Sequence, residues 1–230
     1  MNNKNSIQVG WKWEEVNDIN EWKKPDGPVM RLSYSLGSDL NKKIYDLGCG
    51  VGRHTIYFAR LGYQVSASDI SEEAIKETKK WLNKEGLRAD VQQGRMTKIN
   101  QPDNTFDLVI SMNVIHHAFK NDVIKTISEI HRILKPRGIF YGTIKTKEKD
   151  EVFTNKTNVI VDDQTIILKG GVEDGIPHFF FHKEDIIEFF KDFKFESLVY
   201  TELYFPPNLE EKLLSQKGSG YYRIQVRKPA

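Results

Sequence analysis

The chain has 230 residues, of which 39% are hydrophobic, so it is long enough for one domain with a sizeable core. Its 34 Lys and Arg residues nearly balance its 32 Asp and Glu residues, and this near-neutral charge disfavours nucleic acid as a partner. The apolar runs are far shorter than the roughly 20 residues of a membrane-spanning helix. The polar N-terminus lacks a secretion signal, and the single Cys49 cannot form an internal disulfide. We therefore expect a cytoplasmic protein with no membrane association.

The first 42 residues are polar but rich in large aromatic side chains. We interpret residues 1–42 as an N-terminal arm with two short helical segments around the break at Pro25–Pro28, PDGP. So many rings must pack against something. The arm either covers one edge of the core or acts as a lid over a small molecule, because Trp and Tyr combine rigid faces with a polar edge. The candidates for a substrate pocket here are Trp11, Trp13 and Tyr34.

The stretch Lys43–Arg60, KIYDLGCGVGRHTIYFAR, predicts a buried strand, a glycine-rich turn and the start of a helix. Gly48, Gly50 and Gly52 stand at alternate positions, where glycine allows unusual backbone angles and the close approach of a ligand. A P-loop is excluded because RHT follows Gly52 in place of Lys and Ser or Thr. A dinucleotide fingerprint would place its third glycine one position later. We expect the entrance of a βαβ nucleotide site.

Strands and helices alternate after this turn. The predicted strands are Gln64–Asp69, Ala89–Gln93, Phe106–Ser111 and Gly138–Lys145, and the predicted helices are Ser71–Glu85 and Asp122–Leu134. Such alternation requires a parallel sheet with right-handed crossovers and helices on both faces. We therefore predict a doubly wound α/β domain. Asp69, at the end of its strand, could accept both hydroxyl groups of a ribose.

The last third of the chain breaks this rhythm. Lys145–Asp150, KTKEKD, is expected to be a solvated charged loop, and residues 152–182 a hairpin or an irregular insertion. A helix at Lys183–Lys191 follows, and then strands at Phe195–Leu203 and Gly220–Arg227 that we expect to pair antiparallel at the sheet edge. We thus divide a single domain into the arm, a cofactor-binding core, an insertion that covers the substrate and a C-terminal part, at residues 1–42, 43–145, 146–182 and 183–230.

Four stretches, taken together, resemble a known family. DLGCGVGRHT, SDIS, PDNTFDLVISMNVIHH and EIHRILKPRGIF follow one another as the signature stretches of class I S-adenosylmethionine-dependent methyltransferases do. The resemblance covers about Lys43–Ile144 and is greatest to the small-molecule branch, which includes ubiquinone-type and tellurite-resistance-type enzymes. It implies a Rossmann-like seven-stranded sheet with an antiparallel last strand. It also implies S-adenosylmethionine as cofactor, S-adenosylhomocysteine as product, and a monomer or homodimer that methylates a small molecule.

The resemblance further implies a role for individual residues. Asp69 would bind the ribose, Ile70 and Met96 would pack on the two faces of the adenine, and Asn113 would lie near the reacting sulfur. Arg95 stands where many relatives have an acid that accepts a hydrogen bond from the adenine amino group, and arginine cannot accept one. The residues assigned to the cofactor are Asp46, Gly48, Gly50, Gly52, Arg53, Asp69, Ile70, Arg95, Met96 and Asn113.

Methyl transfer from a sulfonium requires alignment, exclusion of water and, for a protonated acceptor, a base. His116 and His117 follow the fourth strand at the edge where doubly wound sheets bind ligands, so either is a candidate base or substrate contact. A packing or helix-capping role is the alternative. In the insertion, His178, Phe180 and His182 are candidates for the substrate pocket, with packing of a lid on the core as the alternative.

We expect no metal site, because no His, Cys, Asp or Glu residues show ligand spacing with enough partners. Two other functions stay open. The chain could bind the cofactor without catalysis, or it could methylate a protein or RNA. The near-neutral charge and the lack of an Asn-Pro-Pro-Tyr-like motif at Ser111–Val114 count against a macromolecular acceptor.

Overall fold

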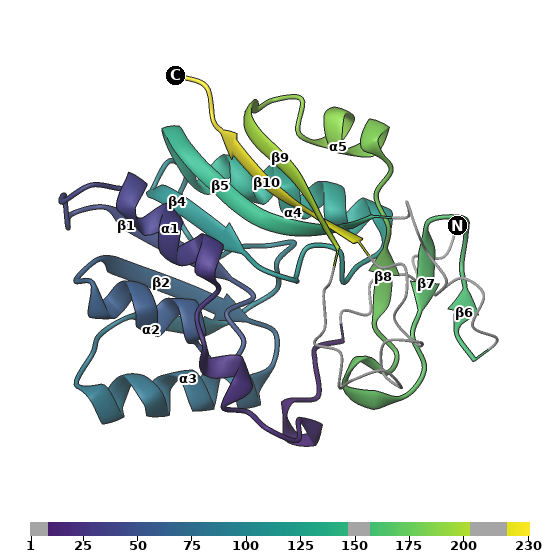
Figure 1. Cartoon of the computed structure of the whole chain (residues 1–230), viewed down its shortest axis with the longest axis horizontal. Helices are drawn as coiled ribbons and strands as arrows, with labels where there is room; N and C mark the ends of the chain where they lie inside the picture. The colour runs from purple at the N-terminus through teal and green to yellow at the C-terminus, as the bar shows by residue number, and fades with distance from the viewer. Residues whose placement is uncertain (1–8, 147–156, 203–219) are drawn as a thin grey trace.

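The protein is described here by a computed structural model that covers residues 9–146, 157–202 and 220–230. One seven-stranded sheet with helices on both faces forms its centre (Figure 1). The strand order is β3 (Asp90–Gln93), β2 (Gln64–Asp69), β1 (Lys43–Leu47), β4 (Phe106–Ser111), β5 (Leu134–Thr146), β10 (Gly220–Arg227) and β9 (Lys194–Glu202). Pairs from β3 to β5 are parallel, whereas β10 is antiparallel to both neighbours. The predicted doubly wound sheet and its antiparallel last strand are confirmed.

The helices form two layers because successive residues of the central strands point to opposite faces. Ile44 packs in a hydrophobic cluster with residues of α1 (Gly27–Ser35) and α2 (Arg53–Arg60). Tyr45, the next residue, packs in the cluster on the other face with α4 (Lys120–Ile133) and α5 (Lys183–Phe189). Ile75 and Leu82 of α3 (Glu72–Glu85) pack against the β2 and β3 end of the sheet. The central strands are therefore buried on both faces.

The starts of two helices follow from their capping residues. Ser71 caps α3, since its Oγ accepts a hydrogen bond from the backbone N–H of Ala74 at 3.2 Å. The break at Pro25–Pro28 is the start of α1, with Pro28 in the first turn. Both short helical segments, η1 (Trp13–Glu15) and η2 (Glu21–Lys23), precede that break and are 3-10 turns. The two short segments were expected on either side of the break, but both precede it, and an α-helix follows it.

The described part of the insertion is a second, three-stranded antiparallel sheet of β6 (Val159–Ile160), β7 (Thr165–Ile167) and β8 (Pro177–Phe179). It lies beside the carboxyl ends of the main strands (Figure 1). The backbone N–H groups of Phe179 and Phe181 donate to the carbonyls of His116 and Lys145 at 2.8 and 2.9 Å. Lys145 was expected in a solvated loop, but it is buried at the end of β5. Most of that loop lies outside the described residues.

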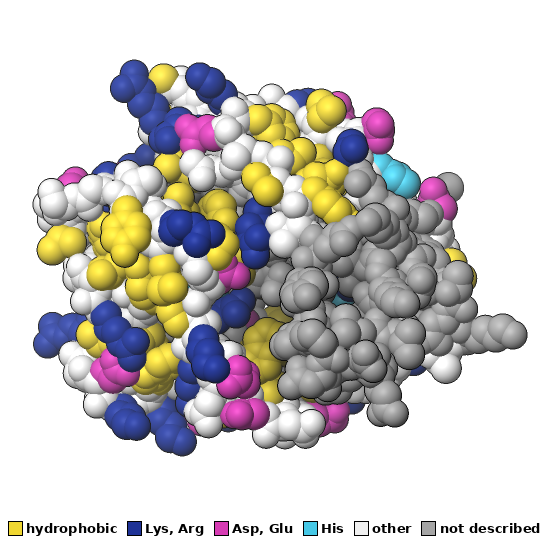
Figure 2. Space-filling view, viewed as in Figure 1, with side chains coloured by type: hydrophobic (Ala, Val, Ile, Leu, Met, Phe, Trp, Pro, Cys, Tyr) yellow, Lys and Arg dark blue, Asp and Glu magenta, His cyan; other side chains and the backbone are white. Residues whose placement is uncertain are grey.

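The distribution of charged side chains on the surface is consistent with the near-neutral net charge of the chain. On the face in Figure 2, the described Lys and Arg side chains are scattered among acidic, apolar and other side chains. Among the helices of the described ranges, none is long and apolar enough to cross a membrane.

Candidate functional site

The glycine-rich loop between β1 and α2 folds against the end of β2. The backbone N–H groups of Gly48 and Cys49 both donate to the carbonyl of Ser68, at 2.8 and 3.0 Å. Gly48, Gly50 and Gly52 have φ angles of +72°, +53° and +93°, which side chains rarely adopt. The predicted glycine turn is thus present, and its glycines are required by the backbone conformation.

Asp69 lies beside this loop at the end of β2. Its Oδ2 accepts a hydrogen bond from the Gly50 N–H at 2.8 Å, and its Oδ1 accepts one from the Ser71 N–H at 2.9 Å. Burial raises the pKa of Asp69, although these two donors oppose the shift. Each carboxylate oxygen keeps a further acceptor site for a ligand hydroxyl.

One pocket at the carboxyl ends of the strands brings together many of the predicted site residues. Asn113 is held there with φ +62°: its N–H donates to Thr143 Oγ1 at 2.7 Å, and that hydroxyl donates to Asn113 Oδ1 at 2.9 Å. The predicted residues that line the pocket are Trp11, Trp13, Gly48, Gly50, Arg53, Asp69, Ile70, Met96, Asn113 and His117.

Three residues assigned to the cofactor lie outside the lining. Asp46 is buried beneath the loop, where its Oδ2 accepts a hydrogen bond from Thr55 Oγ1 at 2.7 Å. Burial raises the pKa of Asp46 to about 6. Gly52 is the N-cap of α2 and packs against Thr78, and Arg95 is exposed beyond β3. In this structure Asp46 and Gly52 shape the loop and do not face the pocket.

Five further candidates for the active site also lie elsewhere. Tyr34 is 82% exposed, because α1 buries its opposite side. Phe180 is fully buried with the Lys145 ammonium 5.2 Å from its ring centroid, and His182 is exposed at the start of α5. His116 and His178 are buried behind His117. The presence of an aromatic residue or a histidine in a segment does not reveal which way its side chain points. The sequence therefore could not distinguish these five residues from the residues that line the pocket.

Three tryptophan rings of the arm form one wall of the pocket. The centroids of Trp11 and Trp22 are 4.6 Å apart, and Trp13 lies 5.4 and 5.8 Å from them. The Arg53 guanidinium lies 5.9 Å from the Trp22 ring centroid. A Cβ atom at Gly50 would lie only 2.7 Å from the Trp13 ring, so the arm packs directly on the glycine loop. Trp22 was not among the predicted pocket residues. The only feature of the sequence that could have indicated it is the high aromatic content of the arm.

The arm is also bonded to the insertion. The Lys12 N–H donates to the carbonyl of Val172 at 3.1 Å, and Trp11 Nε1 donates to Glu173 Oε1 at 3.0 Å. Val172 and Glu173 belong to η4 (Gly171–Glu173), the turn that precedes β8. The two segments expected to surround a substrate therefore meet next to the pocket.

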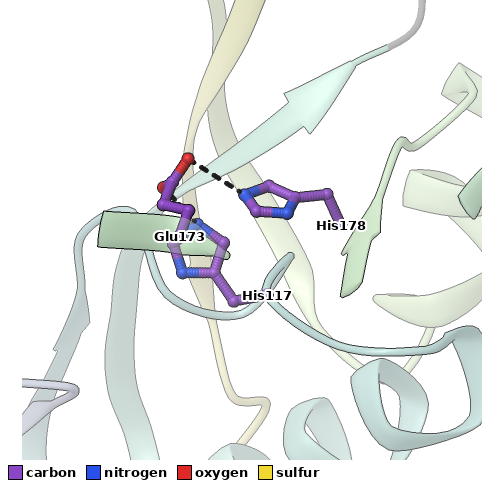
Figure 3. A group of neighbouring side chains, drawn as sticks. All are labelled: His117, Glu173 and His178. Carbon is purple, nitrogen blue, oxygen red and sulfur yellow. Dashed lines mark ion pairs between the residues drawn. The ribbon is translucent and has the colours of Figure 1, made fainter. Parts of the chain in front are cut away.

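Glu173 lies between two histidines (Figure 3). Its carboxylate oxygens are 3.4 Å from His117 Nε2 and 3.5 Å from His178 Nε2. Burial lowers the pKa of His117 to about 3, so its imidazole is uncharged at neutral pH and has a lone pair that can accept a hydrogen bond or ligate a cation. Sequence reasoning missed Glu173, because it lies 56 positions after His117 and only the fold brings the two together.

Comparisons with known proteins agree with this geometry. Residues 45–142 match the family model described as a methyltransferase domain. Over 120 residues the chain is 34% identical to the putative methyltransferase YqeM of Bacillus subtilis. The aligned stretch covers 50% of this chain and 47% of YqeM. The chain thus spans about half the length of this relative.

Two solved structures share the fold. A protein of Methanosarcina mazei described as an S-adenosylmethionine-dependent methyltransferase aligns with a TM-score of 0.69 at 18% identity, covering 83% of this chain and 94% of that one. The 1,6-didemethyltoxoflavin-N1-methyltransferase of Burkholderia thailandensis, solved with bound 1,6-didemethyltoxoflavin and S-adenosylhomocysteine, aligns with a TM-score of 0.62 at 19% identity. That alignment covers 89% of this chain and 78% of the other. The predicted class I methyltransferase fold is confirmed.

Proposed function

We propose that this chain, whose residues 45–142 match the methyltransferase domain model, transfers a methyl group from S-adenosylmethionine to a small-molecule acceptor. The observation that carries the proposal is the pocket in which Asp69 and the glycine loop lie side by side. A carboxylate at the end of the second strand can accept two ribose hydroxyls, and the glycines let the rest of the cofactor approach the backbone.

In this proposal the cofactor extends along the strand ends. Ile70 and Met96, which both line the pocket, pack on the adenine. Asn113 lies across the pocket near the methionine end, where its bonds to Thr143 hold the unusual backbone conformation. Arg95 takes no part in adenine recognition because it is exposed outside the pocket.

The reaction is an in-line displacement. The acceptor atom attacks the methyl carbon, the bonding electron pair of the breaking C–S bond stays on sulfur, and S-adenosylhomocysteine leaves. Trp11, Trp13 and Trp22 exclude water and restrict the position of the acceptor. His117 lines the same pocket with an uncharged imidazole, so it can contact the acceptor; because its pKa is about 3 it is a weak base, and the proton of the acceptor passes to water.

The arm favours a small acceptor over a macromolecule. Its tryptophan cluster covers the glycine loop and is bonded to the insertion, which leaves little room for a folded protein or a nucleic acid beside the cofactor. The Burkholderia thailandensis 1,6-didemethyltoxoflavin-N1-methyltransferase, which shares the fold, has a small molecule, 1,6-didemethyltoxoflavin, bound together with S-adenosylhomocysteine. We therefore expect a compact acceptor with apolar surface.

A screen of small methyl acceptors, with detection of S-adenosylhomocysteine, tests the proposal. We expect product with at least one class of small hydroxyl, amine, thiol or activated carbon compound, above the background without acceptor. Product formed only with protein or RNA would contradict the choice of acceptor. Cofactor binding without product across the screen would favour a catalytically silent module.

A further inference from the structure

The three side chains of Figure 3 form the strongest cluster of metal-ligating groups in the described part of the chain. One ligand atom from each of His117, Glu173 and His178 lies within 4.8 Å of the other two. The residues come from three separate segments: the loop after β4, the turn η4 and strand β8. Their spacing along the chain does not indicate a metal site, because their proximity depends on the packing of the insertion against the core.

The orientation of His178 is specific. Its Nδ1 lies 3.1 Å from the carbonyl oxygen of Ile176, which can only accept, so Nδ1 carries a proton and donates it. A backbone carbonyl that binds one ring nitrogen in this way fixes the tautomer, as is usual for metal-bound histidines. In the uncharged ring, Nε2 then presents a lone pair.

That lone pair faces an acceptor. His178 is fully buried, and its Nε2 has no hydrogen-bond partner among the described residues, although it lies 3.5 Å from Glu173 Oε2. A lone pair opposite a carboxylate in a buried place is unfavourable unless a cation lies between them. The candidates are a proton, which would make an ion pair, and a metal ion.

We infer that His117, Glu173 and His178 bind one divalent transition-metal ion at the edge of the pocket. Zinc with nitrogen and oxygen ligands at about 2.0–2.1 Å in a tetrahedron sets neighbouring ligands about 3.3 Å apart. His117 Nε2 lies 3.4 Å from Glu173 Oε1 and His178 Nε2 lies 3.5 Å from Glu173 Oε2, so an ion between the three side chains would be bound by both carboxylate oxygens or by one of them after a small rotation of the carboxylate. Two histidines and one glutamate also match the three-ligand sets of catalytic zinc sites, which keep one position open.

The ligand set determines which ions should bind. Imidazole favours Zn²⁺, Co²⁺ and Ni²⁺ over Mg²⁺ and Ca²⁺, which prefer oxygen ligands. A site with two imidazoles and one carboxylate is therefore selective for ions that bind nitrogen strongly.

The position of the site suggests its use, and this step rests on the proposed function. His117 and Ile176 line the pocket, so the open coordination position faces the space assigned to the acceptor. The metal would bind an acceptor through a hydroxyl or thiol, lower its pKa and orient it towards the methyl group. The proton leaves to water, and the acceptor attacks the methyl carbon as described above. The substrate class is thus a compact alcohol, phenol or thiol.

Metal binding is measured on the full chain, after chelation and removal of the chelator, by titration with Zn²⁺ and with Co²⁺. We expect one ion per chain, Co²⁺ absorption bands of a four- or five-coordinate site, and no comparable binding of Mg²⁺. His117→Ala and Glu173→Gln should weaken binding at least tenfold. His182→Asn, which changes an exposed histidine outside the cluster, is the matched control and should bind as the wild type does. Cys49 does not compete, because it is buried and its thiol has a raised pKa.

Two outcomes would overturn the inference. Binding below one equivalent, or binding that the His117 and Glu173 variants retain, would mean that a protonated His178 forms an ion pair with Glu173 in place of a metal site. Unfolding of each variant is measured in the same experiment, so a lost fold is distinguished from a lost ligand. S-adenosylhomocysteine binding is measured separately with chelator present. If it persists while metal binding fails, the metal site is wrong and the proposed function stands.

Discussion

Replacing Gly48 by alanine perturbs the glycine loop in a way that the structure specifies closely. The residue has φ +72°, a conformation that costs an ordinary residue roughly 1–2 kcal/mol. The added Cβ would also lie 2.3 and 2.5 Å from the two Cγ atoms of Val114. Such overpacking costs roughly 1–3 kcal/mol more. We therefore expect Gly48→Ala to lower the free energy of unfolding by roughly 2–5 kcal/mol.

Gly86→Ala is the matched control. Gly86 has φ +66° at the end of α3, but nothing lies within 4 Å of an added Cβ. Only the backbone cost of roughly 1–2 kcal/mol is expected there. Denaturant unfolding of both variants separates the two contributions, and Gly48→Ala combined with Val114→Ala should recover part of the packing cost. Equal losses for the two single variants would refute the close packing of the loop on Val114.

Two further predictions concern residues around the pocket. Burial raises the pKa of Asp46 from 3.8 to about 6 in the folded state, so its contribution to stability is present at low pH and is lost as pH rises through 6. Relative to the wild type, Asp46→Asn should therefore gain about 2.5 kcal/mol in unfolding free energy between pH 4 and pH 7.5, and a difference independent of pH would contradict the burial argument. Trp13→Ala should raise the KM for the acceptor at least fivefold, because its ring covers Gly50, whereas the exposed Tyr34→Ala should leave KM unchanged. Equal KM values for the two variants would remove the arm from the acceptor site.

Most of the fold could be predicted because its elements are local patterns. The strands Gln64–Asp69, Phe106–Ser111 and Gly220–Arg227 have the predicted bounds, since each is an alternating or apolar run between turn signals. Ser71 was recognised as a helix cap from its residue type and the acids that follow it. The antiparallel pair at the sheet edge followed from two β-type runs near the end of the chain.

The site was only partly predictable, because its residues depend on long-range packing. The glycine loop and Asp69 are adjacent to strand ends and could be found from spacing. Glu173 could not, because only contacts of η4 with the arm and with two histidines bring it next to His117, which lines the pocket. Tyr34 lies outside the pocket for a related reason: its residue type suits a pocket, but the packing of α1 turns it to the surface.

The most direct test of the account is a calorimetric titration with S-adenosylhomocysteine in the presence of a chelator. We expect one molecule bound per chain by the wild type and by Gly86→Ala. Asp69→Asn should lose roughly 1.5–3 kcal/mol of binding free energy, because it removes the charged acceptor for the ribose hydroxyls. A folded wild-type chain that binds no S-adenosylhomocysteine, or an Asp69→Asn variant that binds it with unchanged affinity, would contradict the central claim.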